Sequence, residues 1–135
     1  MSSVRILRMA IVGGLLMLPA AVPAQQDREA LAALRGIEHG QWQLKDADGA
    51  PLQNLCVTNP AVLLQLRHAN AQCSHFVVAS NEREATIHYT CPGHGYGRTT
   101  VLVETPRLVR VDTQGVIDGA PFSNDLEGRR VGTCN

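Results

Sequence analysis

The run Gly93-His94-Gly95-Tyr96-Gly97 comes nearest, in this sequence, to a known chemical motif. Glycine-rich turns cradle phosphates when they follow a strand and open a helix, because the helix N-terminus then directs backbone N–H groups at the anion. Here residues 98–101 read Arg-Thr-Thr-Val, which favours a strand. We therefore reject a phosphate site and predict a loop whose glycines supply positive φ angles, with Tyr96 packing over it.

A second interpretation of this loop is functional. His94, Tyr96 and Arg98 would be exposed at its tip, and they are the candidate recognition residues predicted from the sequence. The expected partner is an apolar or amphipathic small ligand, or an envelope protein.

Other reactive side chains are scattered. The five histidines lack both the i, i+4 spacing of a zinc protease and a neighbouring acidic ligand, so we predict no metal and no cofactor; they are His39, His68, His75, His88 and His94. No Gly-x-Ser-x-Gly nucleophile motif is present. The acids available for paired-carboxylate chemistry lie beside turns, where carboxylates are usually solvated: Asp112, Asp118, Asp125 and Glu127. We predict no catalytic residues and a protein that is not an enzyme.

The four cysteines predict two disulfides, as an even number does in an exported chain. A zinc site is disfavoured because no Cys-x-x-Cys pair is present. Two β-favouring runs flank the polar turn at 80–83, which is typical of a hairpin. If the turn is centred near Glu82, residues whose numbers sum to 164 face each other. This register pairs Cys73 with Cys91 and leaves Cys56 for Cys134.

Side chains alternate along strands, so the hairpin register also predicts two faces. The face predicted to be buried carries one set of residues on each strand: Cys73, His75, Val77 and Ala79 against Cys91, Tyr89, Ile87 and Ala85. On it His75 would hydrogen-bond the Tyr89 hydroxyl or the backbone. The other, mixed face places Phe76 opposite His88.

The amino-terminal residues predict export. Arg5 and Arg8 precede an apolar run at 9–18 and a small-residue end, Val-Pro-Ala, at 22–24, which together indicate a Sec-type signal peptide over residues 1–24. The apolar run of about ten residues is too short for a bilayer, which needs roughly 20. We therefore expect no stable membrane span after signal removal, and a periplasmic or secreted location.

The remaining chain predicts a lead-in helix or linker over 25–36 and a single disulfide-linked antiparallel β domain over 37–135. Strands are expected at 40–44, 52–57, 99–104 and 107–113, and a hairpin turn at Asp118-Gly119. Asn59 and Pro60 suit the N-cap and first position of a helix reaching residue 69. The predicted fold is mainly β (α+β): a curved antiparallel sheet or partly closed barrel of seven or eight short strands with one or two short helices.

The net charge disfavours nucleic acid as a partner. Removing Arg5 and Arg8 leaves ten basic and twelve acidic residues, a net charge of −2. Nucleic-acid binding needs a clustered basic face, and Arg129-Arg130 is the nearest approach to one.

Several short motifs resemble a known family, the proteobacterial exported domain-of-unknown-function family 3617. They are Gly-x-Trp at 40–42, Cys-Val-Thr at 56–58, the Asn-Pro helix start, Tyr-Thr-Cys at 89–91 and Arg-Arg-Val-Gly-Thr-Cys at 129–134. The resemblance covers about Gly40 to Cys134. It implies a small periplasmic, Gram-negative β domain with no assigned activity and no catalytic residues to transfer. This chain lacks the family's Met- and Gly-rich stretches before the first cysteine, and its glycine loop is unusually compact.

A second likeness supplies an alternative function. Residues 87–91, the glycine loop and the following strand are similar to the opening of the periplasmic lysozyme-inhibitor barrels, which present loops with basic residues to the enzyme cleft. Arg98 is the sole nearby cation, and the only lysine, Lys45, lies elsewhere. The predicted function is thus a non-catalytic binding or envelope-associated module, and the alternative is an inhibitor of a wall-degrading hydrolase.

Overall fold

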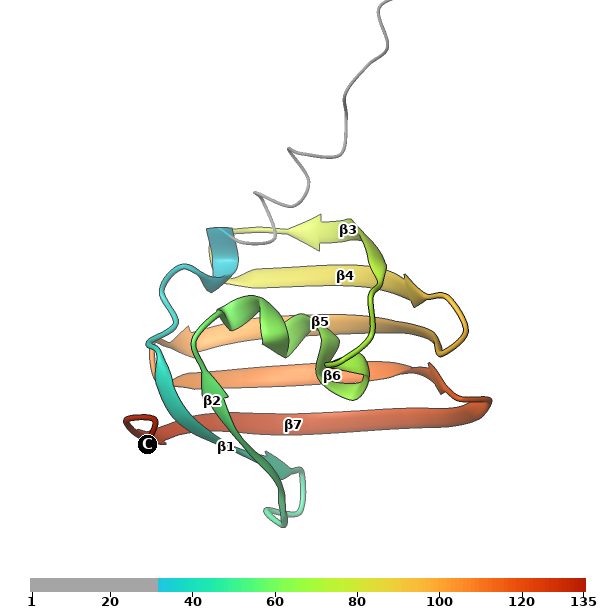
Figure 1. Ribbon diagram of the computed structural model, residues 1–135. Helices are drawn as coiled ribbons and strands as arrows, with labels where there is room; N and C mark the ends of the chain where they lie inside the picture. Colours follow the sequence, from blue (N-terminus) through green and yellow to red (C-terminus); the bar gives the residue numbers. More distant parts are fainter. Residues whose placement is uncertain (1–31) are drawn as a thin grey trace, which may run out of the picture.

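Seven antiparallel strands form one open sheet in the computed structural model, which describes residues 32–135 (Figure 1). The order across the sheet is β2-β1-β7-β6-β5-β4-β3. The strands are β1 (Gly40–Asp46), β2 (Pro51–Val57), β3 (Ser74–Ser80), β4 (Glu84–Cys91), β5 (Gly95–Thr105), β6 (Leu108–Ile117) and β7 (Ala120–Gly132). The mainly β, antiparallel prediction is confirmed, and the sheet is open rather than a partly closed barrel.

A 3-10 helix, η1 (Pro60–His68), crosses one face of the sheet and packs on β4, β5 and β6 (green in Figure 1). The Asn59 side chain accepts a hydrogen bond from the Ala61 N–H at 3.0 Å, and Pro60 follows it, as predicted for the helix start. Gln65 has a non-helical φ of −135°, so the element is kinked. Of the predicted lead-in helix, residues 32–34 are helical, while residues 25–31 and the predicted signal peptide lie outside the described residues.

The hydrophobic core fills the layer between the sheet and η1. Trp42 and Leu44 of β1 are fully buried, and the Trp42 indole N–H is satisfied by the Glu38 carbonyl at 3.0 Å. Other buried side chains come from η1 and from alternate positions on the central strands: Leu63, Leu66, Ile87, Tyr89, Val101, Val109, Val111 and Leu126. Buried side chains alternate with more exposed ones along β5 and β6, because successive side chains of a strand point to opposite faces of the sheet. The face opposite η1 therefore carries the more exposed side chains.

The β3–β4 hairpin follows the predicted register over most of its length. Ser74 faces Thr90 and Val77 faces Ile87, but the register shifts beyond Val77, so that Ala79 faces Thr86 instead of Ala85. The predicted buried face was right for β4. On the other strand it was right in part: Cys73 and Val77 are half-buried against the core, whereas His75 and Ala79 are exposed. The reason is position: β3 is the edge strand of the sheet, whereas β4 lies under η1.

Both predicted disulfides are confirmed. Cys73–Cys91 joins the hairpin strands with a Cα–Cα separation of 4.2 Å, and Cys56–Cys134 joins β2 to the residues after β7 with a separation of 5.6 Å. Because Gln41 of β1 pairs with both Cys56 and Gly132, the second bridge crosses over β1. Two disulfides in a chain of this size indicate an oxidising compartment.

Within residues 32–135, no helix has the length and apolar character needed to cross a membrane.

Candidate functional site

The candidate recognition residues do not share one loop. The turn after β4 is confined to residues 92–94, and β5 begins at Gly95, so the predicted loop over 93–97 was too long. Tyr96 and Arg98 are neighbours on β5 and both are exposed on the face opposite η1. His94 lies in the turn, where its Nδ1 is 3.3 Å from Asp118 Oδ1. The structure therefore brings Tyr96 and Arg98 together and separates His94 from them.

Two needs account for the glycine run. Gly93 and Gly95 have φ angles of +80° and +117°, as predicted for the loop. Gly97 instead lies directly beneath the Tyr89 ring, so that a Cβ there would collide with the phenol. Tyr96 is not a lid, because its side chain is 48% exposed on the other face. The run is thus explained by backbone geometry and by the packing of Tyr89.

Tyr89 anchors a buried polar network under η1. His68 Nε2 lies 3.2 Å from the His94 carbonyl, which can only accept, so Nε2 carries the proton. Nδ1 is then the acceptor for the Tyr89 hydroxyl, 3.1 Å away. Burial raises the pKa of Tyr89 above its ordinary value, although bonding to Thr113 and Thr99 opposes that rise.

This network corrects the predicted partner of Tyr89. His75 is exposed, and its Nε2 lies 3.1 Å from Gln65 Oε1. Sequence reasoning took the histidine opposite Tyr89 in the hairpin and missed His68, which approaches from a helix 21 residues earlier. The available signal was that His68 follows a regular set of buried leucines in the helix.

On the face opposite η1, three rings cross β3, β4 and β5. We name them the aromatic row: Phe76, His88 and Tyr96. The ring centroids of Phe76 and His88 are 5.2 Å apart, and those of His88 and Tyr96 are 6.2 Å apart. Phe76 is 52% exposed, and Val78 beside it on β3 is 46% exposed. Large apolar side chains gathered on one face mark an interaction surface more often than singly exposed ones do.

The aromatic row borders a shallow depression of about 460 Å³ that continues across β5, β6 and β7. Its lining includes His88, Tyr96, Arg98, Gln114, Val116 and Pro121. The guanidinium of Arg98 makes no hydrogen bond or ion pair with any residue in 32–135. The surface therefore combines exposed rings, aliphatic side chains and an unpaired guanidinium, which suits an amphipathic partner.

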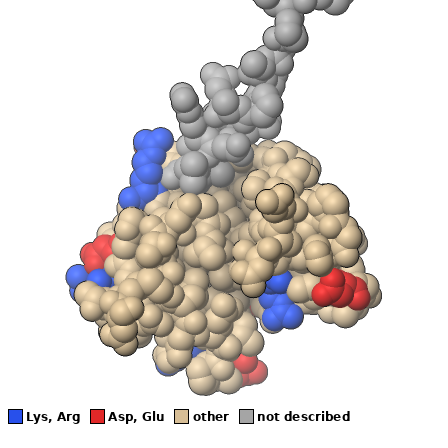
Figure 2. Space-filling view, in the orientation of Figure 1, with Lys and Arg blue, Asp and Glu red and all other residues tan. Residues whose placement is uncertain are grey.

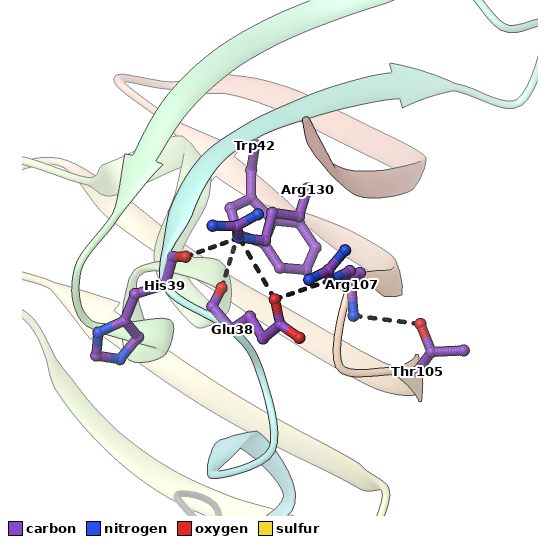
Figure 3. Close-up of polar contacts among 6 residues, drawn as sticks. All are labelled: Glu38, His39, Trp42, Thr105, Arg107 and Arg130. Atoms are coloured by element: carbon purple, nitrogen blue, oxygen red, sulfur yellow. Dashed lines mark hydrogen bonds and ion pairs between the residues drawn. The ribbon is translucent and has the colours of Figure 1, made fainter. Parts of the chain in front are cut away.

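A polar cluster at one end of the sheet is structural (Figure 3). Glu38 Oε2 accepts a hydrogen bond from Arg107 Nε at 2.8 Å and lies 3.7 Å from Arg130 Nε. Arg130 also donates to the His39 carbonyl at 2.8 Å, next to the Trp42–Glu38 bond. These contacts tie the segment before β1 to the β5–β6 turn and to β7, and they pair the charged groups with one another. Among the described residues on the face that Figure 2 shows, basic and acidic side chains lie at separate places and form no large patch of one sign.

The acidic residues considered for paired-carboxylate chemistry are only partly brought together. Asp112 and Asp125 face each other across β6 and β7. Glu127 accepts a hydrogen bond from Arg129, and Asp118 lies in the β6–β7 turn beside His94. In the part of the chain that the structure describes, no group of three or more His, Cys, Asp or Glu residues is arranged to hold a metal ion.

The chain matches no known protein-family model, and no similar protein was found among curated proteins or solved structures. The resemblance to domain-of-unknown-function family 3617 therefore stays a prediction.

Proposed function

We propose that this chain is an exported, periplasmic or secreted, non-catalytic binding module whose aromatic row and adjoining depression hold an amphipathic ligand. The observation that carries the proposal is the exposure of Phe76 and Tyr96, about half of each side chain, on a sheet face that no other described element covers. Fully burying a large apolar side chain is more favourable than leaving it in water by roughly 1.5–3 kcal/mol. A partner that covers them recovers part of this free energy.

Arg98 gives the surface a polar end. A ligand with an apolar body and an anionic or hydrogen-bonding group can cover the rings and meet the guanidinium at once, because both line the same depression. The two disulfides support a location in an oxidising compartment. An envelope protein with the same combination of groups is the second predicted partner.

The test uses a probe of this chemistry, anilinonaphthalene sulfonate, whose fused rings and sulfonate match the two ends of the surface. We expect saturable fluorescence enhancement, and an affinity about tenfold weaker in Tyr96→Ala, equivalent to about 1.4 kcal/mol. Arg98→Gln should weaken binding similarly. Val131→Ala is the matched control, because Val131 is also exposed, at 57%, but does not line the depression.

Native mass spectrometry of protein purified from the periplasm completes the test. A bound species lost in Tyr96→Ala and kept in Val131→Ala supports the proposal. A bare mass, together with equal probe binding by the wild type and Tyr96→Ala, contradicts it. The hydrolase-inhibitor alternative stays a prediction with no structural observation in its favour, and a lysozyme turbidity assay tests it directly.

A further inference from the structure

Arg67, in the last turn of η1, has an unusual environment for a cation. Its Nε is buried and has no hydrogen-bond partner, and its Cζ lies 5.4 Å from the centroid of the Phe122 ring. No carboxylate within residues 32–135 forms an ion pair with it. A partly desolvated charge without a counter-ion is costly, and contact with one ring face offsets only part of that cost.

The other described arginines do not share this environment. Five of them bond carboxylates or carbonyls: Arg83, Arg107, Arg110, Arg129 and Arg130. The guanidinium groups of Arg35 and Arg98 also lack a partner among the described residues, but both residues are exposed, so water solvates them. Arg67 alone among the described arginines is both partly buried and unpaired.

Arg67 lines a depression of about 400 Å³ at the end of η1, on the face opposite the aromatic row. The end of η1 meets the turns after β4 and β6 there, so the walls come from distant parts of the chain. Side-chain amides and an imidazole lie around it, together with aliphatic groups: Gln53, Asn70 and His94, with Leu66 and Ile117. The volume exceeds that of a bare ion and suits a small organic molecule.

We propose that this depression binds a small organic carboxylate, with Arg67 as the cation that anchors it. A planar carboxylate matches the guanidinium fork and gives the buried charge its missing counter-ion. Asn70, Gln53 and His94 supply donors and acceptors for a hydroxyl or amide elsewhere on the ligand.

The charge of the rim favours one negative charge over two. Asp118 also lines the depression, and its exposed carboxylate adds a negative charge to the rim beside His94, whose Nδ1 is 3.3 Å away. Repulsion from Asp118 acts more strongly on a phosphate dianion than on a carboxylate. This selects a monocarboxylate as the ligand class.

The experiment is a titration followed by NMR, with N-acetylalanine as the probe because it combines a carboxylate with an amide. We expect saturable shifts of the Arg67 Nε–H signal and of the Asn70 amide signals, with a Kd of about 1–10 mM. Arg67→Gln should weaken binding at least about tenfold, and Arg67→Lys should fall between, because lysine keeps the charge and loses the fork. Arg35→Gln should bind as the wild type does, because Arg35 is exposed and lines neither depression.

Three results would overturn the proposal. The first is the absence of saturable shifts up to about 50 mM probe, which is above the expected Kd. The second is the same affinity in Arg67→Gln as in the wild type. The third is tighter binding of inorganic phosphate than of N-acetylalanine, which would make phosphate rather than a carboxylate the preferred ligand class. If Arg67→Gln loses its dispersed spectrum, Arg67→Lys decides, and an unchanged affinity there contradicts the fork. Tyr96→Ala should leave this titration unchanged, so the site on the sheet face stands or fails separately.

Discussion

The phenol ring of Tyr89 occupies the space that a side chain on Gly97 would need. The two residues face each other across β4 and β5, and a Cβ built on Gly97 would overlap the ring carbons and hydroxyl of the fully buried Tyr89. The hydroxyl in turn donates to His68. One missing side chain therefore lets a buried ring reach the helix that covers it.

Gly97→Ala should destabilise the fold by about 1–3 kcal/mol, because the added methyl displaces a packed ring. Urea denaturation measures the loss. Gly132→Ala is the control, since no atom lies within 4 Å of a Cβ there, and it should stay within about 0.5 kcal/mol of the wild type. Equal losses of stability in the two variants would show that the Tyr89 ring is not the reason for glycine at position 97.

The Tyr89 pKa predicts a loss of stability in alkali. A tyrosine in the unfolded chain ionises near 10.0, whereas burial raises the pKa of Tyr89 in the native state. Above about pH 10 the unfolded chain therefore binds fewer protons than the native protein does. The stability that the Tyr89 hydroxyl contributes is fully present below that pH and is lost as the pH rises through the native pKa of Tyr89.

Tyr89→Phe isolates this contribution. At neutral pH it should cost about 1–3 kcal/mol, because His68 loses its buried partner. The gap between wild type and variant should narrow above pH 10 in urea unfolding measured at successive pH values. A gap that stays constant to pH 11, about one unit above the ordinary tyrosine pKa, would contradict the raised pKa.

Breaking Cys56–Cys134 with the double substitution Cys56→Ala and Cys134→Ala should loosen one edge of the sheet selectively. The bridge closes a sequence separation of 78 residues, for which the chain-entropy model predicts a stabilisation of up to about 4.5 kcal/mol. The true stabilisation should be smaller, because Cys73–Cys91 already shortens the loop. Hydrogen exchange should rise first in β2 and in residues 132–135. The control pair Cys73→Ala and Cys91→Ala should raise exchange in β3 instead. The same exchange pattern in both variants would contradict this assignment.

Arg130 should matter more to stability than Arg107, although both contact Glu38. The Arg130 side chain is 19% exposed and donates to the His39 carbonyl, whereas that of Arg107 is 65% exposed. We expect Arg130→Met to cost about 1–2 kcal/mol, because it removes the hydrogen bond from a largely buried guanidinium to the His39 carbonyl. Arg107→Met should cost less than about 1 kcal/mol, as for an exposed ion pair. Chemical denaturation compares them, and the reverse order would refute the role given to His39.

Local patterns predicted the local structure well. The register that pairs Cys73 with Cys91 follows from alternation about one turn, and the Asn59-Pro60 helix start and the Asp118-Gly119 turn follow from the needs of the backbone at those positions. Each depends on residues close together in the chain.

Several errors involve distant partners. His75 was expected inside because its own hairpin gave no sign that β3 would be the edge of the sheet. The contact of His68 with Tyr89 depends on how η1 lies across three strands, and the need for glycine at position 97 depends on a ring from the neighbouring strand. The buried, unpartnered Nε of Arg67 likewise lies where two turns and a helix end meet.

The order of the paired cysteines also bears on biosynthesis. Ribosomes make a chain from its amino end, so Cys56 appears first and its partner, Cys134, is the last of the four cysteines to appear. Cys73 and Cys91 both come within reach of Cys56 before then, and a link to either would be non-native. Any such link has to be exchanged for the native ones, and a cell lacking a disulfide isomerase should accumulate mispaired forms of this protein.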